Sequence, residues 1–163
     1  MSRSLVASSI ALTLTLAACT DRRVAPTDAS APSRTVVLGS DSASPFLADG
    51  WYTAEGDHRW LGKRGTVMLA GPATAGQQIH LTGYCPAAEV ATGSLTGKVS
   101  VDGQPVGELT LAKGDAPFDV ALPLPAATVG KPRISVTIEL DRTFRPAGDV
   151  RDLGLSFSTI EIR

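Results

Sequence analysis

The stretch RISVTIEL, residues 133–140, alternates apolar and polar side chains without a break. Successive side chains of a β-strand point to opposite faces of the sheet, so the two isoleucines, the valine and the leucine fall on one face. The arginine, serine, threonine and glutamate fall on the other face. This pattern predicts a strand that is buried on one side and open to solvent on the other.

The same period of two recurs through most of the C-terminal two thirds of the chain. It appears in residues 78–82, 98–101 and 118–124. The pair Asp102-Gly103 provides a hairpin turn into residues 106–111. The sixteen glycines and eleven prolines fall mostly between the alternating runs, as turn residues do. We therefore predict an all-β domain at residues 49–163, a single jelly-roll-like β-sandwich of about seven or eight antiparallel strands.

Two breaks in the alternation predict β-bulges. Val106 is out of step with the apolar residues at positions 109 and 111, and Phe157 is out of step with those at 160 and 162. Each slip requires one extra residue in the strand, which a bulge supplies. Gly107 is the natural position for the first bulge.

The N-terminus, MSRSLVASSIALTLTLAACT, is typical of a secretory signal. One cation, Arg3, precedes 17 uncharged residues, fewer than the roughly 20 apolar residues that span a bilayer. Its end, Leu-Ala-Ala-Cys at residues 16–19, resembles the lipobox of bacterial lipoproteins. The resemblance implies that the chain is cut before Cys19 and that acyl chains on Cys19 anchor it to a lipid bilayer. The alternative is an ordinary signal peptide with an incidental cysteine.

This resemblance divides the region before the domain into two parts. Residues 1–18 are the expected signal peptide, and residues 19–48, rich in Ser, Ala and Pro, are an expected flexible tether. An alternative for the apolar patch at residues 35–38 is an extra strand at the domain edge. Thr20, rather than an aspartate, follows the cysteine, which by analogy with the sorting rule of enteric bacteria favours the outer membrane. The domain is then expected to face the periplasm or the cell surface.

Charge and cysteine content argue against several functions. With 15 basic and 16 acidic residues the chain has a net charge of −1, and it lacks the clustered positive residues that nucleic-acid binding requires. With Cys19 lipidated, Cys85 is the one remaining thiol, so no intrachain disulfide forms, and we expect Cys85 to be a small buried residue. The two histidines show no zinc-type spacing, and no calcium loop is present. We expect no cofactor and no metal, and the alternative that the sequence leaves open is a single calcium ion bridging two loops of the sandwich.

The segment GWYTAEGDHRW, residues 50–60, holds both tryptophans of a chain in which aromatic residues make up 5%. Alternation puts His58 and Trp60 on one face of a strand. We expect Trp60 to be buried against residues 134–140, and we expect Gly56 to interrupt the strand, so that the residues before it lie in a loop.

Sugar binding is the first function that these aromatic residues suggest. Aromatic side chains combine an apolar face with a polar edge, which suits a ligand that has apolar and hydroxyl-bearing sides. We therefore predict Trp51, Tyr52 and Tyr84 as ligand-binding residues.

Charged residues at the two ends of the domain predict ion pairs. They are Glu55, Arg59, Asp149 and Arg151. A guanidinium binds a carboxylate with two parallel hydrogen bonds, so Arg151 can join Glu55 or Asp149 and connect the two ends of the domain. We expect Arg59 to pair with Glu55, Asp149 or Asp152. Direct ligand binding by these side chains is the alternative.

The same segment does not provide a recognisable catalytic site. Nothing in the sequence fixes the separation of Glu55 and Asp57, which a glycosidase pair requires. A serine-hydrolase triad built on Asp57 and His58 lacks a G-x-S-x-G elbow, and adjacent residues of a strand point to opposite faces. We therefore predict that the domain is not an enzyme.

Four segments resemble, in this order, a β-sandwich module of bacterial glycosyltransferases and other cell-surface polysaccharide proteins. They are GWYTAE…RW (50–60), VDGQPVGELTL (101–111), FDVALPLP (118–125) and LDRTFRPAGDVRDLGLSFSTIEI (140–162). The middle portion also resembles jelly-roll carbohydrate-binding and galactose-binding-like domains. The resemblance implies a sandwich fold. We expect a membrane-anchored, non-catalytic domain that binds envelope carbohydrate. The alternative is a structural or protein-interaction module of the envelope, which docks through an exposed sheet face.

Overall fold

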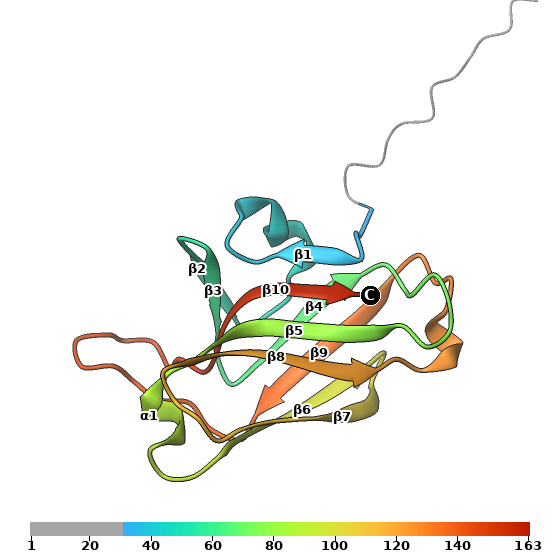
Figure 1. Ribbon diagram of the computed structural model, residues 1–163. Helices are drawn as coiled ribbons and strands as arrows, with labels where there is room; N and C mark the ends of the chain where they lie inside the picture. Colours follow the sequence, from blue (N-terminus) through green and yellow to red (C-terminus); the bar gives the residue numbers. More distant parts are fainter. Residues whose placement is uncertain (1–30) are drawn as a thin grey trace, which may run out of the picture.

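The alternating stretch forms β9 (Ile134–Leu140), which lies inside a four-stranded antiparallel sheet. The computed structural model describes residues 31–163, and within them ten strands form two antiparallel sheets (Figure 1). The four-stranded sheet that contains β9 is called the second sheet here. Its order is β4 (Arg64–Leu69), β9, β6 (Leu95–Val101) and β7 (Gln104–Leu111). The predicted signal peptide and Cys19 lie outside the described residues.

The first sheet contains the remaining six strands. Its order is β2 (Trp51–Glu55), β3 (His58–Leu61), β10 (Ser156–Ile162), β5 (Gln78–Cys85) and β8 (Ala116–Pro123). Two strands pair with the same edge of β10. β3 pairs with the first residues of β10, and a short strand, β1 (Thr35–Val37), pairs with its C-terminal half. The prediction of an all-β sandwich is therefore confirmed, with ten strands in place of seven or eight.

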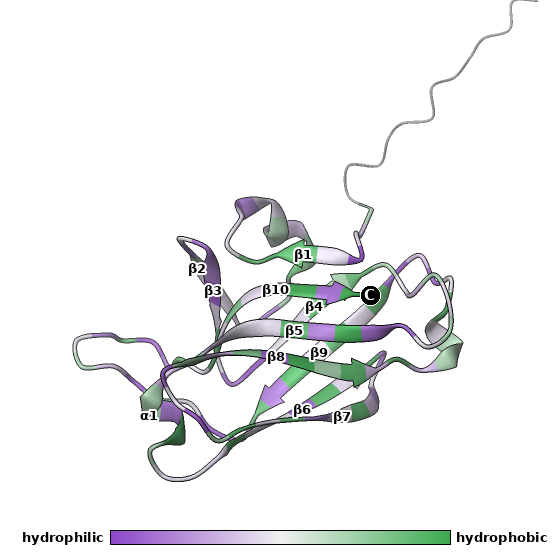
Figure 2. Ribbon diagram, viewed as in Figure 1, coloured by the Kyte–Doolittle hydropathy of each residue, from purple (hydrophilic) through white to green (hydrophobic). Residues whose placement is uncertain are grey.

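The core lies between the inner faces of the two sheets. All four apolar residues of β9 are at most 1% exposed, and the apolar residues of β5, β6 and β8 that alternate with polar ones also face inward. Figure 2 shows the resulting alternation of hydrophobic and hydrophilic bands along the strands. Residues of one parity thus build the core, and residues of the other parity face solvent.

Both predicted bulges are present. In the β6–β7 pair, Val99 is opposite Gly107 whereas Ser100 is opposite Pro105, which leaves Val106 as the extra residue. In the β10–β5 pair the register shifts between Phe157 and Thr159, so that one residue of β10 lies out of register. These bulges let the strands return their apolar residues to the core after each slip.

The folded unit begins before Asp49, which corrects the prediction of a tether through residue 48. Val36 pairs with Ile160 of β10 and is 3% exposed, and Leu38 is fully buried. A short 3-10 helix, η1 (Asp41–Phe46), follows and buries Ala43. The apolar patch at residues 35–38 is therefore an edge strand, the alternative that the sequence offered, because its side chains complete the core beside β10.

The remaining elements close the ends of the sandwich. They are the short helices α1 (Ala87–Val90) and η2 (Ala126–Thr128). The connection between β9 and β10, residues 141–155, is held together by a bridge between Phe144 and Leu153. None of the helices in residues 31–163 is long and apolar enough to cross a membrane.

Candidate functional site

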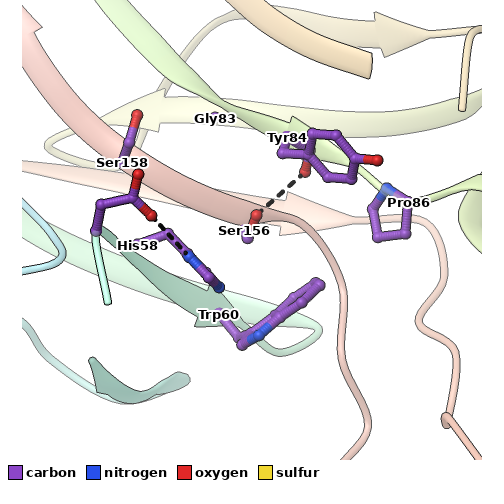
Figure 3. Close-up of a pocket in the computed structure, with 8 residues that line it drawn as sticks. His58, Trp60, Gly83, Tyr84, Pro86, Ser156 and Ser158 are labelled. Atoms are coloured by element: carbon purple, nitrogen blue, oxygen red, sulfur yellow. Dashed lines mark hydrogen bonds and ion pairs between the residues drawn. The ribbon is translucent and has the colours of Figure 1, made fainter. Parts of the chain in front are cut away.

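An open hollow of about 460 Å³ lies on the solvent-facing side of the first sheet. Figure 3 shows the residues around it, which come from β3, β10 and β5, from the turn between β2 and β3, and from Pro86 just after β5. Trp60, Tyr84 and His58 are the aromatic residues among them. Ser156, Ser158 and Asp57 supply polar groups.

Strand register places the two large aromatic residues in one row. Ser156 of β10 is paired with Trp60 of β3 on one side and with Tyr84 of β5 on the other. Neighbouring strands lie about 4.8 Å apart, so the backbones of the two aromatic residues lie roughly 10 Å apart. Ser156 itself is 4% exposed. Because a serine side chain is small, this position leaves a gap between the two aromatic side chains.

Trp60 does not lie in the core, contrary to the prediction. His58 and Trp60 share a face, as expected, but that face is the outer one, because Arg59 and Leu61 point inward at 6% and 0% exposure. The indole of Trp60 makes edge-to-face contacts with His58, at 5.8 Å between ring centroids, and with Phe144, at 6.3 Å. Trp60 thus becomes a residue of the hollow.

Trp51 takes the opposite position from the one predicted. It lies in β2 rather than in a loop, and its ring meets the buried Phe157 edge-to-face at 5.6 Å. Its indole nitrogen donates a hydrogen bond to the carbonyl oxygen of Thr66, 3.0 Å away. Gly56, at φ +63°, ends β2 in a two-residue turn into β3, as the first central residue of a type II′ hairpin turn does. The segment is therefore a hairpin, and Trp51 is its packing residue.

The predicted ion pair between the ends of the domain is present. Nη1 of Arg151 lies 2.5 Å from Oε1 of Glu55, and Nη2 lies 2.7 Å from Oδ2 of Asp149. The hydrogen bond from Arg151 is the main cause that lowers the pKa of Glu55, and hydrogen bonds from Arg151 lower the pKa of Asp149 to about 2. The other Glu55 oxygen, Oε2, accepts a hydrogen bond from the indole nitrogen of Trp60 at 3.2 Å. An ionised Glu55 therefore holds Trp60 in place.

Tyr52 supports this network and does not line the hollow. The guanidinium carbon of Arg151 lies 5.3 Å from the centre of its ring, as in a cation–π contact. Its hydroxyl donates to the carbonyl oxygen of Asp152 at 2.9 Å. The prediction of Tyr52 as a ligand-binding residue thus gains no support from its position.

Tyr84 lies at the hollow, where a ligand-binding residue is expected. Tyr84 is 41% exposed, and it is one of the few large hydrophobic residues that face solvent in the described part of the chain. The hydroxyl donates to Oδ1 of Asp115 at 3.3 Å, and the same oxygen accepts the backbone N–H of Ala87 at 2.9 Å. Desolvation, followed by the charge of Asp115, raises the pKa of the Tyr84 phenol above its usual value. The ring is therefore neutral and is held at its edge.

Arg59 does not form the predicted ion pair. In residues 31–163 no carboxylate lies within salt-bridge distance of it, because its side chain points inward, away from Glu55. Its guanidinium donates instead to the carbonyl oxygens of Leu38 and Tyr52, both at 3.1 Å, and of Ser40 at 3.4 Å. Arg59 thus joins the N-terminal segment to the hairpin.

The polar groups at the hollow do not form a hydrolase triad. The prediction against an Asp57–His58 pair assumed that Asp57 lies in the strand beside His58. Asp57 lies in the turn instead, and its Oδ1 is 3.2 Å from Nδ1 of His58. However, the hydroxyls of Ser156 and Ser158 donate to the carbonyl oxygens of Tyr84 and Thr82, at 3.5 and 3.3 Å. Neither hydroxyl is bonded to the imidazole, so no activated nucleophile is assembled.

Other chemistries find less support in the described part of the chain. Cys85 is 1% exposed, and burial raises the pKa of its thiol, which keeps it protonated and confirms the prediction of a small buried residue. No group of three or more His, Cys, Asp or Glu side chains in residues 31–163 is placed to hold a metal ion.

A second hollow of about 580 Å³ lies on the outer face of the other sheet, where Arg64, Lys98 and Glu139 line it without any aromatic side chain.

The comparisons with known proteins give likeness in fold alone. No protein-family model matches the chain, and no curated protein matches it in sequence. A family 35 carbohydrate-binding module from Clostridium thermocellum is similar in structure, with a TM-score of 0.42 and 10% identity over 78% of this chain and 96% of that one. The resemblance to the glycosyltransferase-associated module stays a prediction.

Parts of two larger enzymes are similar as well. An arabinoxylan arabinofuranohydrolase from Bacillus subtilis has a TM-score of 0.45 and 12% identity, over 80% of this chain and 27% of that one. An exo-β-1,3-galactanase from Phanerochaete chrysosporium has a TM-score of 0.39 and 14% identity, over 81% and 26%. This chain thus spans about a quarter of the length of these two enzymes.

Proposed function

We propose that the domain is a non-catalytic carbohydrate-binding module and that the hollow between Trp60 and Tyr84 is its site. The observation that carries this proposal is the row Trp60–Ser156–Tyr84, in which two aromatic side chains lie on either side of a small residue. A sugar ring has apolar C–H faces and a polar rim. Aromatic faces suit the former, and hydroxyl, imidazole and carboxylate groups suit the latter.

The way the two rings are held supports binding rather than packing. The indole N–H of Trp60 and the hydroxyl of Tyr84 are both occupied by carboxylates, Glu55 and Asp115. The rings are thereby fixed by their edges, and both lie at the hollow, where Tyr84 is 41% exposed. A site whose residues are already ordered loses less entropy when the ligand binds. Polar partners for sugar hydroxyls stand beside the rings, since the side chain of Asp57 is 98% exposed and that of His58 is 32% exposed.

A glycan array tests the proposal. The purified wild-type protein is applied to bacterial envelope polysaccharides and their oligosaccharides, beside Trp60→Ala, Tyr84→Ala and the control Trp51→Phe. We expect binding by the wild type and by Trp51→Phe, and loss of that binding in both alanine variants. Binding that persists in Trp60→Ala contradicts the proposed site. Silence across the array supports the alternative of a structural or protein-interaction module.

We propose further that Cys19 carries the lipid that anchors the protein to the bacterial membrane, with the domain facing the periplasm or the cell surface and the outer membrane favoured. The support is the lipobox-like ending Leu-Ala-Ala-Cys at residues 16–19. Metabolic labelling with an alkyne fatty acid is expected to mark the wild type and to spare Cys19→Ala. Labelling that survives the substitution overturns the anchor.

A further inference from the structure

Charge is distributed unevenly around the hollow. Its lining contains one carboxylate, Asp57, and no lysine or arginine among the described residues. Asp57 stands in the β2–β3 turn with a 98% exposed side chain, and its partner is the imidazole of His58. A ligand that enters the hollow therefore meets a negative charge that no lysine or arginine of the lining offsets.

A second carboxylate lies behind the opposite wall. Asp115 accepts hydrogen bonds from the Tyr84 hydroxyl and from the backbone N–H of Ala87, which are both neutral donors. None of the salt bridges in residues 31–163 involves Asp115. The negative charge of Asp115 therefore acts on the Tyr84 side of the hollow, and no salt bridge in residues 31–163 neutralises it.

The wall formed by Trp60 is also backed by negative charge. Glu55, which accepts the indole N–H, shares Arg151 with Asp149, so these three charged groups carry a net charge of −1. A donor N–H or O–H that is bonded to a carboxylate shifts electron density into its ring. The faces of Trp60 and Tyr84 thereby become more negative, and a negative ring face attracts cations.

We propose, on the basis of the carbohydrate-binding function proposed above, that the sugar bound in this hollow carries a free, protonated amine, as a deacetylated hexosamine does. The amine lies against the face of Trp60 or Tyr84 and within reach of Asp57. The same charges repel carboxylated sugars, and a neutral sugar gains hydrogen bonds from Asp57 without the attraction between opposite charges. Selection for the amine is electrostatic, and it therefore weakens as salt concentration rises.

Isothermal titration calorimetry of the whole protein tests this inference with three probes: the trimers of glucosamine, N-acetylglucosamine and galacturonic acid. At about pH 7 an amine with a pKa near that of an α-amino group, roughly 7.7–8.0, is largely protonated, whereas an ordinary imidazole is largely neutral. We expect the glucosamine trimer to bind about tenfold more tightly than its acetylated counterpart, and we expect no measurable binding of the galacturonic acid trimer. The difference between the first two trimers should shrink in high salt.

Substitutions locate the effect. Asp57→Asn is expected to reduce the affinity ratio of the two hexosamine trimers several-fold, and Trp60→Ala to abolish binding of the glucosamine trimer. The matched control is Asp119→Asn, which removes the same charge from the outer end of the sheet, where Asp119 pairs with Arg163. Its affinity ratio is expected to stay at the wild-type value.

Each remaining outcome decides the question. Equal affinity for the acetylated and free trimers, or preference for the galacturonic acid trimer, overturns the amine preference and leaves the carbohydrate-binding proposal standing. An amine preference that survives Trp60→Ala places amine binding elsewhere and overturns this assignment. Absence of binding to all three trimers also overturns it, and the glycan array then decides separately whether the domain binds other sugars.

Discussion

The two tryptophans provide a direct energetic test of the fold, because one supports the core and the other lines the hollow. Trp51 packs its ring against the buried Phe157 and donates to the carbonyl oxygen of Thr66. Truncating a tryptophan that is packed in this way costs about 3–5 kcal/mol. Trp60 contacts His58 and Phe144 only edge-to-face on the outer side of the sheet. Two such contacts contribute about 1–3 kcal/mol together.

Urea denaturation followed by far-UV circular dichroism measures both losses. We expect Trp51→Ala to lose about 3–5 kcal/mol, a large share of the roughly 5–15 kcal/mol that stabilises a domain. Trp60→Ala should lose about 1–3 kcal/mol with an unchanged m-value. Trp51→Phe keeps the aromatic packing and loses the hydrogen bond, so it should lie between the wild type and Trp51→Ala. An equal or larger loss for Trp60→Ala would refute this assignment of the two residues.

Two further substitutions test the stability of the domain. Arg59→Met leaves the carbonyl oxygens of Leu38 and Tyr52 without the guanidinium donor, whereas that of Ser40 still accepts the backbone N–H of Ala43. We therefore expect a loss of about 2 kcal/mol or more in urea denaturation. A loss below about 1 kcal/mol would contradict the role of Arg59 in joining the N-terminal segment to the hairpin. Glu89 is 1% exposed, and burial raises its pKa to about 7. The folded state therefore binds this proton more tightly than the unfolded chain, and the free energy of unfolding falls as the pH rises from about 4.5 to about 7, by on the order of 2–3 kcal/mol. Glu89→Gln should flatten this part of the stability profile, and an unchanged slope would show that other groups cause it.

The fold could be predicted from the sequence because the period of two is unbroken in several strands, β9 and β5 among them. In β9 and β5 the buried and exposed residues alternate as the pattern requires, and both slips in parity mark real bulges. β1 was harder to predict, because three residues are too few to show a period. It is ordered by pairing with β10, a partner more than 100 residues away, which local composition does not reveal.

The candidate site was harder to predict because the sequence does not say which face of a strand is buried. His58 and Trp60 were correctly placed on one face, but that face was expected to be the buried one. The apolar Leu61, one residue later, carried the better signal, since it must be buried and so turns Trp60 outward. Arg59 then has to share the inner face with Leu61, an arrangement that is acceptable only because main-chain carbonyls satisfy its guanidinium.

Ser156 and Ser158 could not be recognised as residues of the hollow at all. Nothing in the local sequence distinguishes them from other serines, and their position depends on the register of β10 between β3 and β5. The row Trp60–Ser156–Tyr84 joins three segments that are distant in the chain. Only the arrangement of the strands brings them together.

The central claim is that a sugar enters the hollow beside Trp60, and an NMR titration tests it most directly. The chain has two tryptophans, so the wild type gives two indole N–H resonances, and Trp51→Phe identifies them by removing one. The glucosamine trimer, with its N-acetylated counterpart as a second titrant, should shift the Trp60 resonance and leave that of Trp51 in place. A shift at Trp51, or shifts elsewhere on the protein while Trp60 stays unmoved, would contradict the proposed site.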